Sequence, residues 1–143
     1  LSLCTHLSQL SPFENSLSDP IPPELGPLKS LQYSDLGNNF LNGSHPDSIF
    51  NCISLLGIGF TFNNLTGRIP TNIGNLVNAT QILGYGNNSV GSIPLSIGQL
   101  GALGALDFSQ NKISSVIPSK IVNLTFRIPS IVPKFLEWEN PFR

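Results

Sequence analysis

The chain has 143 residues, of which 10 % are charged, compared with about 25 % in an average soluble domain, and its formal net charge is −1. Such a charge provides no electrostatic basis for binding nucleic acid or an anionic membrane surface. The longest nearly apolar stretch, Ile53 to Phe62, has ten residues. A membrane span needs about 20, so we expect no span in this chain. We also expect no signal peptide within it, because no basic segment followed by an apolar one opens the sequence.

A 24-residue period runs through the chain. Proline recurs at this step at Pro22, Pro46, Pro70, Pro94 and Pro118. Asparagine keeps the same step at Asn15, Asn39, Asn63, Asn87 and Asn111. Fixed self-similarity at 20 to 29 residues, with leucine and asparagine in phase, is typical of leucine-rich repeats.

The third repeat shows what each unit contains, in chain order. Ile58 and Phe60 alternate with smaller residues, which predicts a short strand with one face inward. Asn63 would turn the chain, because its amide can bond backbone groups that the strand leaves unpaired. Gly67 permits a turn with positive φ, and the segment 73–76, Ile-Gly-Asn-Leu, predicts a short helical or 3-10 turn.

We therefore predict an α/β repeat solenoid. A parallel β-sheet would form its concave face, short helical or 3-10 turns its convex face, and the asparagines a buried ladder. Residues 1–125 would hold about five repeats without an amino-terminal cap, beginning in mid-repeat, and residues 126–143 a tail that departs from the repeat. Small residues at three apolar positions, Ser34, Gly84 and Ser89, predict gaps in the core.

The repeat pattern supports a more specific resemblance. The pattern Leu-x-x-Leu-x-Leu-x-x-Asn-x-Leu-x-Gly-x-Ile-Pro, seen in part at 55–70 and 103–118, resembles the plant-type leucine-rich repeat. It is similar to the repeats of receptor-like kinase ectodomains and of polygalacturonase-inhibiting proteins. The resemblance implies a plant protein on the extracellular face of the plasma membrane, or secreted to the cell wall. As partners it implies a peptide or protein ligand on the concave face and, for a receptor, a co-receptor.

No motif in the chain predicts enzymatic chemistry. Ser44, His45 and Asp47 are close in sequence, but a catalytic triad needs convergence in space and an oxyanion site. His45 occupies the isoleucine position before the proline, so we interpret it as a core residue. Cys4 and Cys52 fall in one repeat column and are interpreted as core residues standing in for leucine, with no disulfide between them. We expect no catalytic residue, metal or cofactor in this chain; a parent kinase domain would lie outside it.

Five Asn-x-Ser/Thr sequences are candidate glycosylation sites. One of them uses Asn87, which belongs to the predicted buried ladder, so we expect no glycan there. The better acceptors are Asn42, Asn64, Asn78 and Asn123.

The concave face is the predicted functional surface, because solenoids bind partners on such extended surfaces. Its outward positions fall at 9–14, 33–38, 57–62, 81–86 and 105–110, between and after the inward residues. Aromatic side chains are frequent binding anchors, and carboxylates can pair basic groups of a ligand. On these grounds the candidate ligand-binding residues are Tyr33, Asp35, Phe62, Tyr85 and Asp107.

Three functional interpretations remain open at this point. The first is a ligand-binding fragment of a plant receptor-like kinase ectodomain that takes part in peptide or pathogen-pattern perception and defence signalling. The second is a secreted inhibitor of cell-wall hydrolases similar to polygalacturonase-inhibiting proteins. The third is a truncated product without activity, suggested by the loss of the repeat after Thr125.

Overall fold

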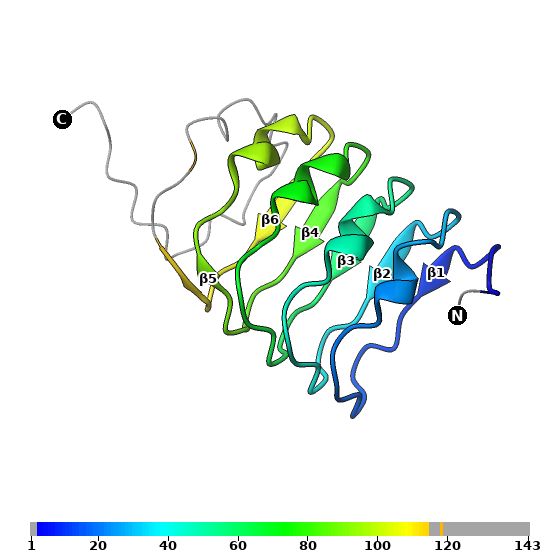
Figure 1. The fold of residues 1–143 in the computed structure, drawn as a ribbon, viewed down its shortest axis with the longest axis horizontal. Helices are drawn as coiled ribbons and strands as arrows, with labels where there is room; N and C mark the ends of the chain where they lie inside the picture. Colours follow the sequence, from blue (N-terminus) through cyan, green and yellow to red (C-terminus); the bar gives the residue numbers. More distant parts are fainter. Residues whose placement is uncertain (1–2, 115–117, 119–143) are drawn as a thin grey trace.

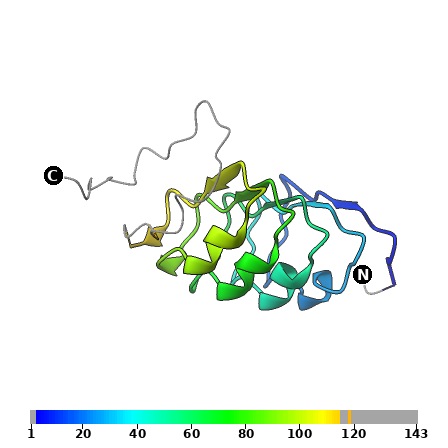
Figure 2. The same cartoon turned by 90° about the horizontal axis from the view of Figure 1, so that it is seen from above.

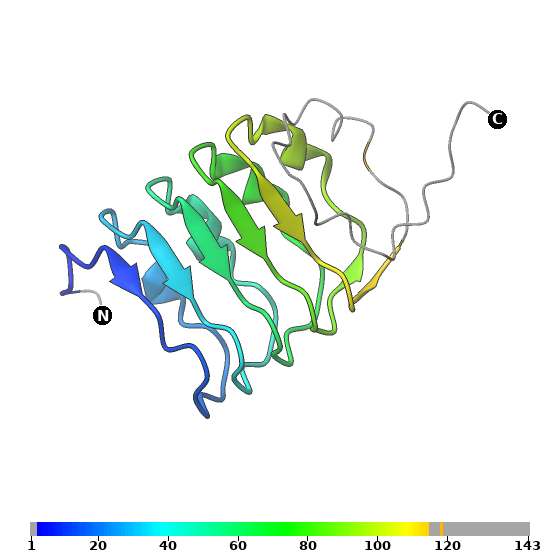
Figure 3. The ribbon, with the colours of Figure 1, turned by 180° about the vertical axis from the view of Figure 1, so that it is seen from behind.

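A computed structural model describes residues 3–114 and 118 and shows a solenoid built around a five-stranded parallel sheet (Figure 1). The strands lie side by side in chain order (Figure 3). They are β1 (Gln9–Leu10), β2 (Tyr33–Asp35), β3 (Gly57–Gly59), β4 (Gln81–Leu83) and β6 (Ala105–Asp107). Paired residues are 24 apart at every step, so the sequence period is the structural repeat. The predicted tail, 126–143, and Asn123 lie outside the described residues.

Short 3-10 helices line the side opposite the sheet (Figure 2). They are η1 (Pro23–Leu25), η2 (Asp47–Asn51), η3 (Thr71–Asn75) and η4 (Leu95–Gln99). Each begins directly after a proline of the 24-residue column, whose φ near −65° leads an extended segment into the helix. This arrangement confirms the predicted sheet on one face and short helical turns on the other.

A second, smaller ribbon pairs neighbouring repeats. It forms where the chain passes from a strand of the main sheet to the following 3-10 helix. Its two strands are β5 (Val90–Gly91) and β7 (Lys112–Ile113), which pair in parallel. Single bridges continue the ribbon through the earlier repeats, pairing Ser44 with Thr66 and Arg68 with Val90. The repeat pattern did not predict this ribbon.

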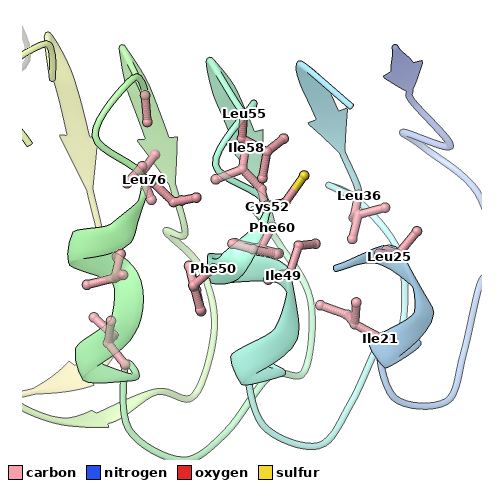
Figure 4. Close-up of a cluster of buried hydrophobic side chains, with 14 of the residues drawn as sticks. Ile21, Leu25, Leu36, Ile49, Phe50, Cys52, Leu55, Ile58, Phe60 and Leu76 are labelled. Carbon is pink, nitrogen blue, oxygen red and sulfur yellow. The ribbon is translucent and has the colours of Figure 1, made fainter. Parts of the chain in front are cut away.

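Apolar side chains from every repeat meet between the sheet and the 3-10 helices (Figure 4). The inward residues of β3 and its continuation, Ile58 and Phe60, are 2 % and 0 % exposed. From the helical side Ile49 and Phe50 pack against them. Because each repeat covers its apolar face only with its neighbours, the core is a continuous column along the solenoid.

The asparagine ladder has the hydrogen bonds expected of it. Asn63 Nδ2 donates to the carbonyls of Leu36, Phe60 and Thr61 at 3.0–3.2 Å, and its Oδ1 accepts from the Leu41 N–H at 2.9 Å. Asn39, Asn87 and Asn111 repeat this pattern. These side chains satisfy buried backbone groups in the turn after each strand.

Two of the three predicted core gaps are filled, so the expectation was wrong for Gly84 and Ser89. The ring of Phe108, from the next repeat, occupies the space where a Gly84 side chain would lie. Ser89 is fully buried and its Oγ lies 3.1 Å from His45 Nε2. Ser34 is also buried, and its hydroxyl has no hydrogen-bond partner in the described part of the chain; a gap at this position remains a prediction.

The two cysteines have different environments. Cys52 is buried and its Sγ lies 3.2 Å from the Leu28 carbonyl oxygen, which confirms it as a core residue. Cys4 is exposed, so its interpretation as a core residue was wrong. Both thiols are free.

Candidate functional site

A groove of about 290 Å³ crosses the outer face of the sheet. It runs over four successive strands, from β1 to β4, and continues into the turns that follow them. Among its lining residues are Gln9, Phe13, Tyr33, Asp35, Gly57, Gly59, Gln81, Leu83 and Tyr85. The groove is on the face that the alternation of the strands had assigned to binding.

Two glycines of β3 form the floor of the groove. A Cβ on Gly57 would lie 3.0 Å from Tyr33 Cδ1 and 2.9 Å from Gln81 Nε2, and one on Gly59 would lie 2.8 Å from Asp35 Oδ1. The neighbouring side chains therefore lean over the bare backbone of β3. The repeat pattern predicted that both glycines face solvent, which was wrong, because these neighbours bury them. Gly37 and Thr61 were also expected to face solvent and are buried.

A carboxylate is fixed beside this floor by its own turn. Asp35 Oδ1 accepts a hydrogen bond from the Gly37 N–H at 3.0 Å. Asp107 makes the equivalent bond with the Ser109 N–H at 2.8 Å. Aspartate favours such bonds to backbone two residues on, so the end of the strand determines where each carboxylate lies.

An aromatic pair borders the groove in the third and fourth repeats. The rings of Phe62 and Tyr85 meet edge to face, with centroids 4.9 Å apart and an interplanar angle of 81°. Phe62 is 46 % exposed although its φ is +49°, a region that bulky residues rarely adopt. Gly86 makes the arrangement possible, because a Cβ there would lie 2.6 Å from Phe62 Cδ1.

The positive φ of Phe62 belongs to the repeat itself. The residue before each ladder asparagine has this conformation, namely Glu14, Asn38, Phe62, Gly86 and Gln110. Asparagine and glycine adopt a positive φ readily, whereas phenylalanine does not. The turn therefore does not account for a large half-exposed ring at this position, which is consistent with a contact surface.

Three of the five predicted ligand-binding residues, Tyr33, Asp35 and Tyr85, line the groove. Phe62 contacts Tyr85, and Asp107 lies farther along the sheet, on β6. Phe13, Gln81 and the two glycines of β3 also line the groove. The sequence placed them among the outward positions of the concave face, but they were not among the five chosen candidates. The role of Tyr33, Asp35, Phe62, Tyr85 and Asp107 in ligand binding remains a prediction.

The glycosylation candidates Asn42, Asn64 and Asn78 are exposed. Asn87 is 7 % exposed and donates to three backbone carbonyls, consistent with the expectation of no glycan there. Modification of the three exposed residues remains a prediction.

The structure also shows the surroundings of the residues considered for catalysis. His45 is 3 % exposed and lies among the rings of Phe50, Phe60 and Phe108, and burial lowers its pKa to about 4. Within residues 3–114 and 118, no group of three or more His, Cys, Asp or Glu side chains could hold a metal ion. The same residues form no helix that is long and apolar enough to span a membrane.

Comparisons with known proteins agree with this geometry. No protein-family model matches the chain, and a search of curated proteins finds no match either. Solved structures do match. The crystal structure of PEPR1–AtPEP1 is similar with a TM-score of 0.84 and 37 % identity over 86 % of this chain. The ectodomain of GASSHO1/SCHENGEN3 from Arabidopsis thaliana, in complex with CASPARIAN STRIP INTEGRITY FACTOR 2, has the same TM-score and identity over 85 %.

This chain is a leucine-rich repeat array that resembles plant receptor kinase ectodomains. The plant peptide hormone receptor RGFR1 in complex with RGF2 is also similar, with a TM-score of 0.82 and 34 % identity over 85 % of the array. This chain covers only 17 %, 15 % and 20 % of the lengths of these three solved chains. It corresponds to a few consecutive repeats of a much longer solenoid in each of them.

Proposed function

We propose that this leucine-rich repeat array is a ligand-binding part of the ectodomain of a plant cell-surface receptor-like kinase, and that its groove takes a peptide. Two similar solved structures are described with such ligands: the plant peptide hormone receptor RGFR1 in complex with RGF2, and the HAESA ectodomain in complex with an IDA peptide hormone. The proposal puts the array on the extracellular face of the plasma membrane. A kinase domain would belong to another part of the parent protein.

The glycine floor is the observation that carries the proposal. Gly57 and Gly59 lower the surface of β3 between the side chains of Tyr33, Asp35 and Gln81. Glycine in a strand interior weakens packing and often marks a place where another backbone approaches closely. An extended peptide lying across the strands would therefore run low over β3 and contact the side chains of Tyr33, Asp35 and Gln81, which cover the glycine floor.

Signalling is the finer part of the proposal. We infer that the parent receptor perceives a peptide or a pathogen pattern and acts in defence. The sequence around 56–67 and 91–98 also resembles the ectodomain of the flagellin-sensing receptor kinase, and this narrower likeness remains a prediction. A co-receptor would be a second partner. A similar solved structure, the BIR3–SERK2 complex from Arabidopsis thaliana, contains two proteins bound to one another.

The test fills the groove without altering the rest of the array. Gly59→Leu places a branched side chain against Asp35, on the groove floor. Gly101→Leu is the matched control, because a Cβ at Gly101 has open space around it. The purified 143-residue chain and both variants, compared first by circular dichroism, are each panned with a display library of linear twelve-residue peptides.

We expect the wild-type chain and Gly101→Leu to enrich the same peptides. Gly59→Leu should bind those peptides at least about tenfold more weakly, because the leucine side chain occupies the groove floor. A tenfold change in affinity corresponds to about 1.4 kcal/mol of binding free energy. Equal binding by all three proteins, or no enrichment by the wild-type chain, would contradict the proposed groove.

A further inference from the structure

Charge is distributed unevenly over the described residues. The face of the sheet and its following turns carry three carboxylates, those of Glu14, Asp35 and Asp107, and no lysine or arginine. The basic residues of the same part of the chain lie elsewhere: Lys29 beyond η1, Arg68 at the second ribbon and Lys112 in β7. A chain with a net charge of only −1 thus presents a locally acidic concave face. Such a face favours a basic ligand.

Two of these carboxylates occupy one row across the sheet. Strand register places Asp35 next to Gly59, Gly59 next to Leu83, and Leu83 next to Asp107. Three inter-strand steps of about 4.7–4.9 Å separate the two aspartates, which is about 14 Å. Four residues of an extended peptide, at about 3.3 Å each, span about 13 Å, and residues i, i+2 and i+4 share one face. The two aspartates are therefore about as far apart as the side chains of residues i and i+4 of an extended peptide, with residue i+2 between them.

Each carboxylate has capacity for a ligand cation. Only Oδ1 of Asp35 and of Asp107 accepts a hydrogen bond from the described residues, which leaves the second oxygen of each available. Tyr33 stands two residues before Asp35 on the same face of β2 and is 40 % exposed. A guanidinium or ammonium group beside Asp35 could thus meet a carboxylate and an aromatic ring together.

The middle of the row has a different character. Gly59 supplies no side chain, and Leu83 is apolar and half-buried. A ligand side chain directed at this point meets Leu83, because the Asp35 carboxylate leans over Gly59. An apolar side chain gains most there, because it loses no hydration of a polar group.

From this geometry we infer that the concave face, from the groove at Asp35 to Asp107 on β6, selects extended peptides with the pattern basic-x-apolar-x-basic. One basic side chain would lie at Asp35 beside Tyr33, the apolar one between Gly59 and Leu83, and the second basic one at Asp107. This inference rests on the proposed function and adds the chemistry of its ligand.

The peptides enriched by the wild-type chain in the library provide the first measurement. Their sequences should contain two lysine or arginine residues four apart, with an apolar residue midway, well above the frequency in the starting library. The best such peptide, labelled with fluorescein, then serves as the probe in fluorescence anisotropy.

Isosteric variants separate charge from structure. In Asp35→Asn the remaining oxygen can still accept the Gly37 N–H, so the turn is kept while the charge is lost. We expect the probe to bind about tenfold more weakly to Asp35→Asn, and also to Asp107→Asn. Asp107→Asn is made in bacteria, because the change creates an Asn-Phe-Ser sequence. The control is Asp47→Asn, an exposed change in η2 on the opposite side, which should alter binding less than about twofold.

The outcomes separate the two proposals. Enriched peptides that require an open Gly59 but lack paired basic residues would overturn the basic-x-apolar-x-basic pattern and leave the peptide groove intact. Unchanged binding of the probe to Asp35→Asn would overturn it in the same way. Absence of any peptide sensitive to Gly59→Leu would remove both proposals.

Discussion

At the scale of single residues, His45 has the environment least expected from its position in the repeat. It replaces an isoleucine of the column that also holds Ile21 and Ile69. Its ring packs edge to face against Phe60, with centroids 5.2 Å apart, and its Nε2 meets the Ser89 hydroxyl two repeats on. The second ring nitrogen, Nδ1, has no hydrogen-bond partner in the described residues. A neutral imidazole fits this site, whereas a protonated one would be buried without a counter-charge.

The stability of the chain should therefore depend on pH through His45. Burial lowers its pKa from 6.5 to about 4, so between these values the unfolded chain binds more protons than the folded one. The free energy of unfolding should fall by roughly 3 kcal/mol as the pH drops from 7 to 4. His45→Ile should lose this part of the dependence, as measured by urea unfolding at several pH values.

The exposed histidine provides the control for that measurement. His6→Gln should keep the pH dependence of the wild-type chain, because His6 is exposed and only His45 is buried. If His45→Ile retained the full decline between pH 7 and 4, the decline would come from carboxyl groups instead.

The burial of His45 could be predicted from its place in the isoleucine column, but its partners could not. The repeat indicates which residues point inward, not how a large side chain uses space left by a small one in another repeat. Phe108 fills the place beside Gly84, and His45 reaches Ser89 across 44 residues of sequence. Each substitution read alone appeared as a gap, because the compensating residue lies in a different repeat.

At the scale of elements, the turn after each strand depends on one asparagine. Asn63→Ala should remove the acceptor that the described residues provide for the buried Leu41 N–H, and also the donor to three carbonyls. We expect a loss of about 2–4 kcal/mol in the free energy of unfolding, since a buried donor without a partner carries its full desolvation cost. The measurement is urea unfolding followed by circular dichroism.

Asn15 is the matched control for the ladder. It occupies the same column but is exposed, and it donates only to the carbonyls of Pro12 and Phe13 in its own turn. Asn15→Ala should cost less than about 1 kcal/mol. Similar losses for the two variants would mean that bonds between neighbouring repeats add nothing to the turn.

The main elements followed from the sequence because each is marked in every repeat. Alternating apolar residues indicated the strands, and proline followed by Ile-Gly-x-Leu indicated the 3-10 helices. The β5–β7 ribbon carries no such mark. Its strands have two residues each, and they pair through backbone groups at positions such as Val90 and Lys112, whose side chains show no alternation.

At the scale of the whole molecule, the concave face could be located before the structure, but its groove could not. The repeat pattern predicts which positions face outward, but it does not predict the orientation of their side chains. Tyr33, Asp35 and Gln81 all lie toward β3 because Gly57 and Gly59 leave space there. Which outward residues share a surface therefore depends on contacts between three consecutive repeats, and the period of one repeat does not contain that information.

A repeat array should also open from the side where a strand has fewer neighbours. Within the described sheet β3 is paired on both sides, by β2 and β4, whereas β1 is paired only by β2. Ile58 is 2 % exposed, while Leu10 of β1 is only partly buried. Since repeat stability is a sum of nearest-neighbour terms, β1 should open without disturbing β3. We expect hydrogen exchange at the Ile58 amide to be slower than at the Leu10 amide by on the order of a hundredfold. Equal exchange rates would show that these repeats open as one cooperative unit, and the groove between them would then form or disappear as a whole.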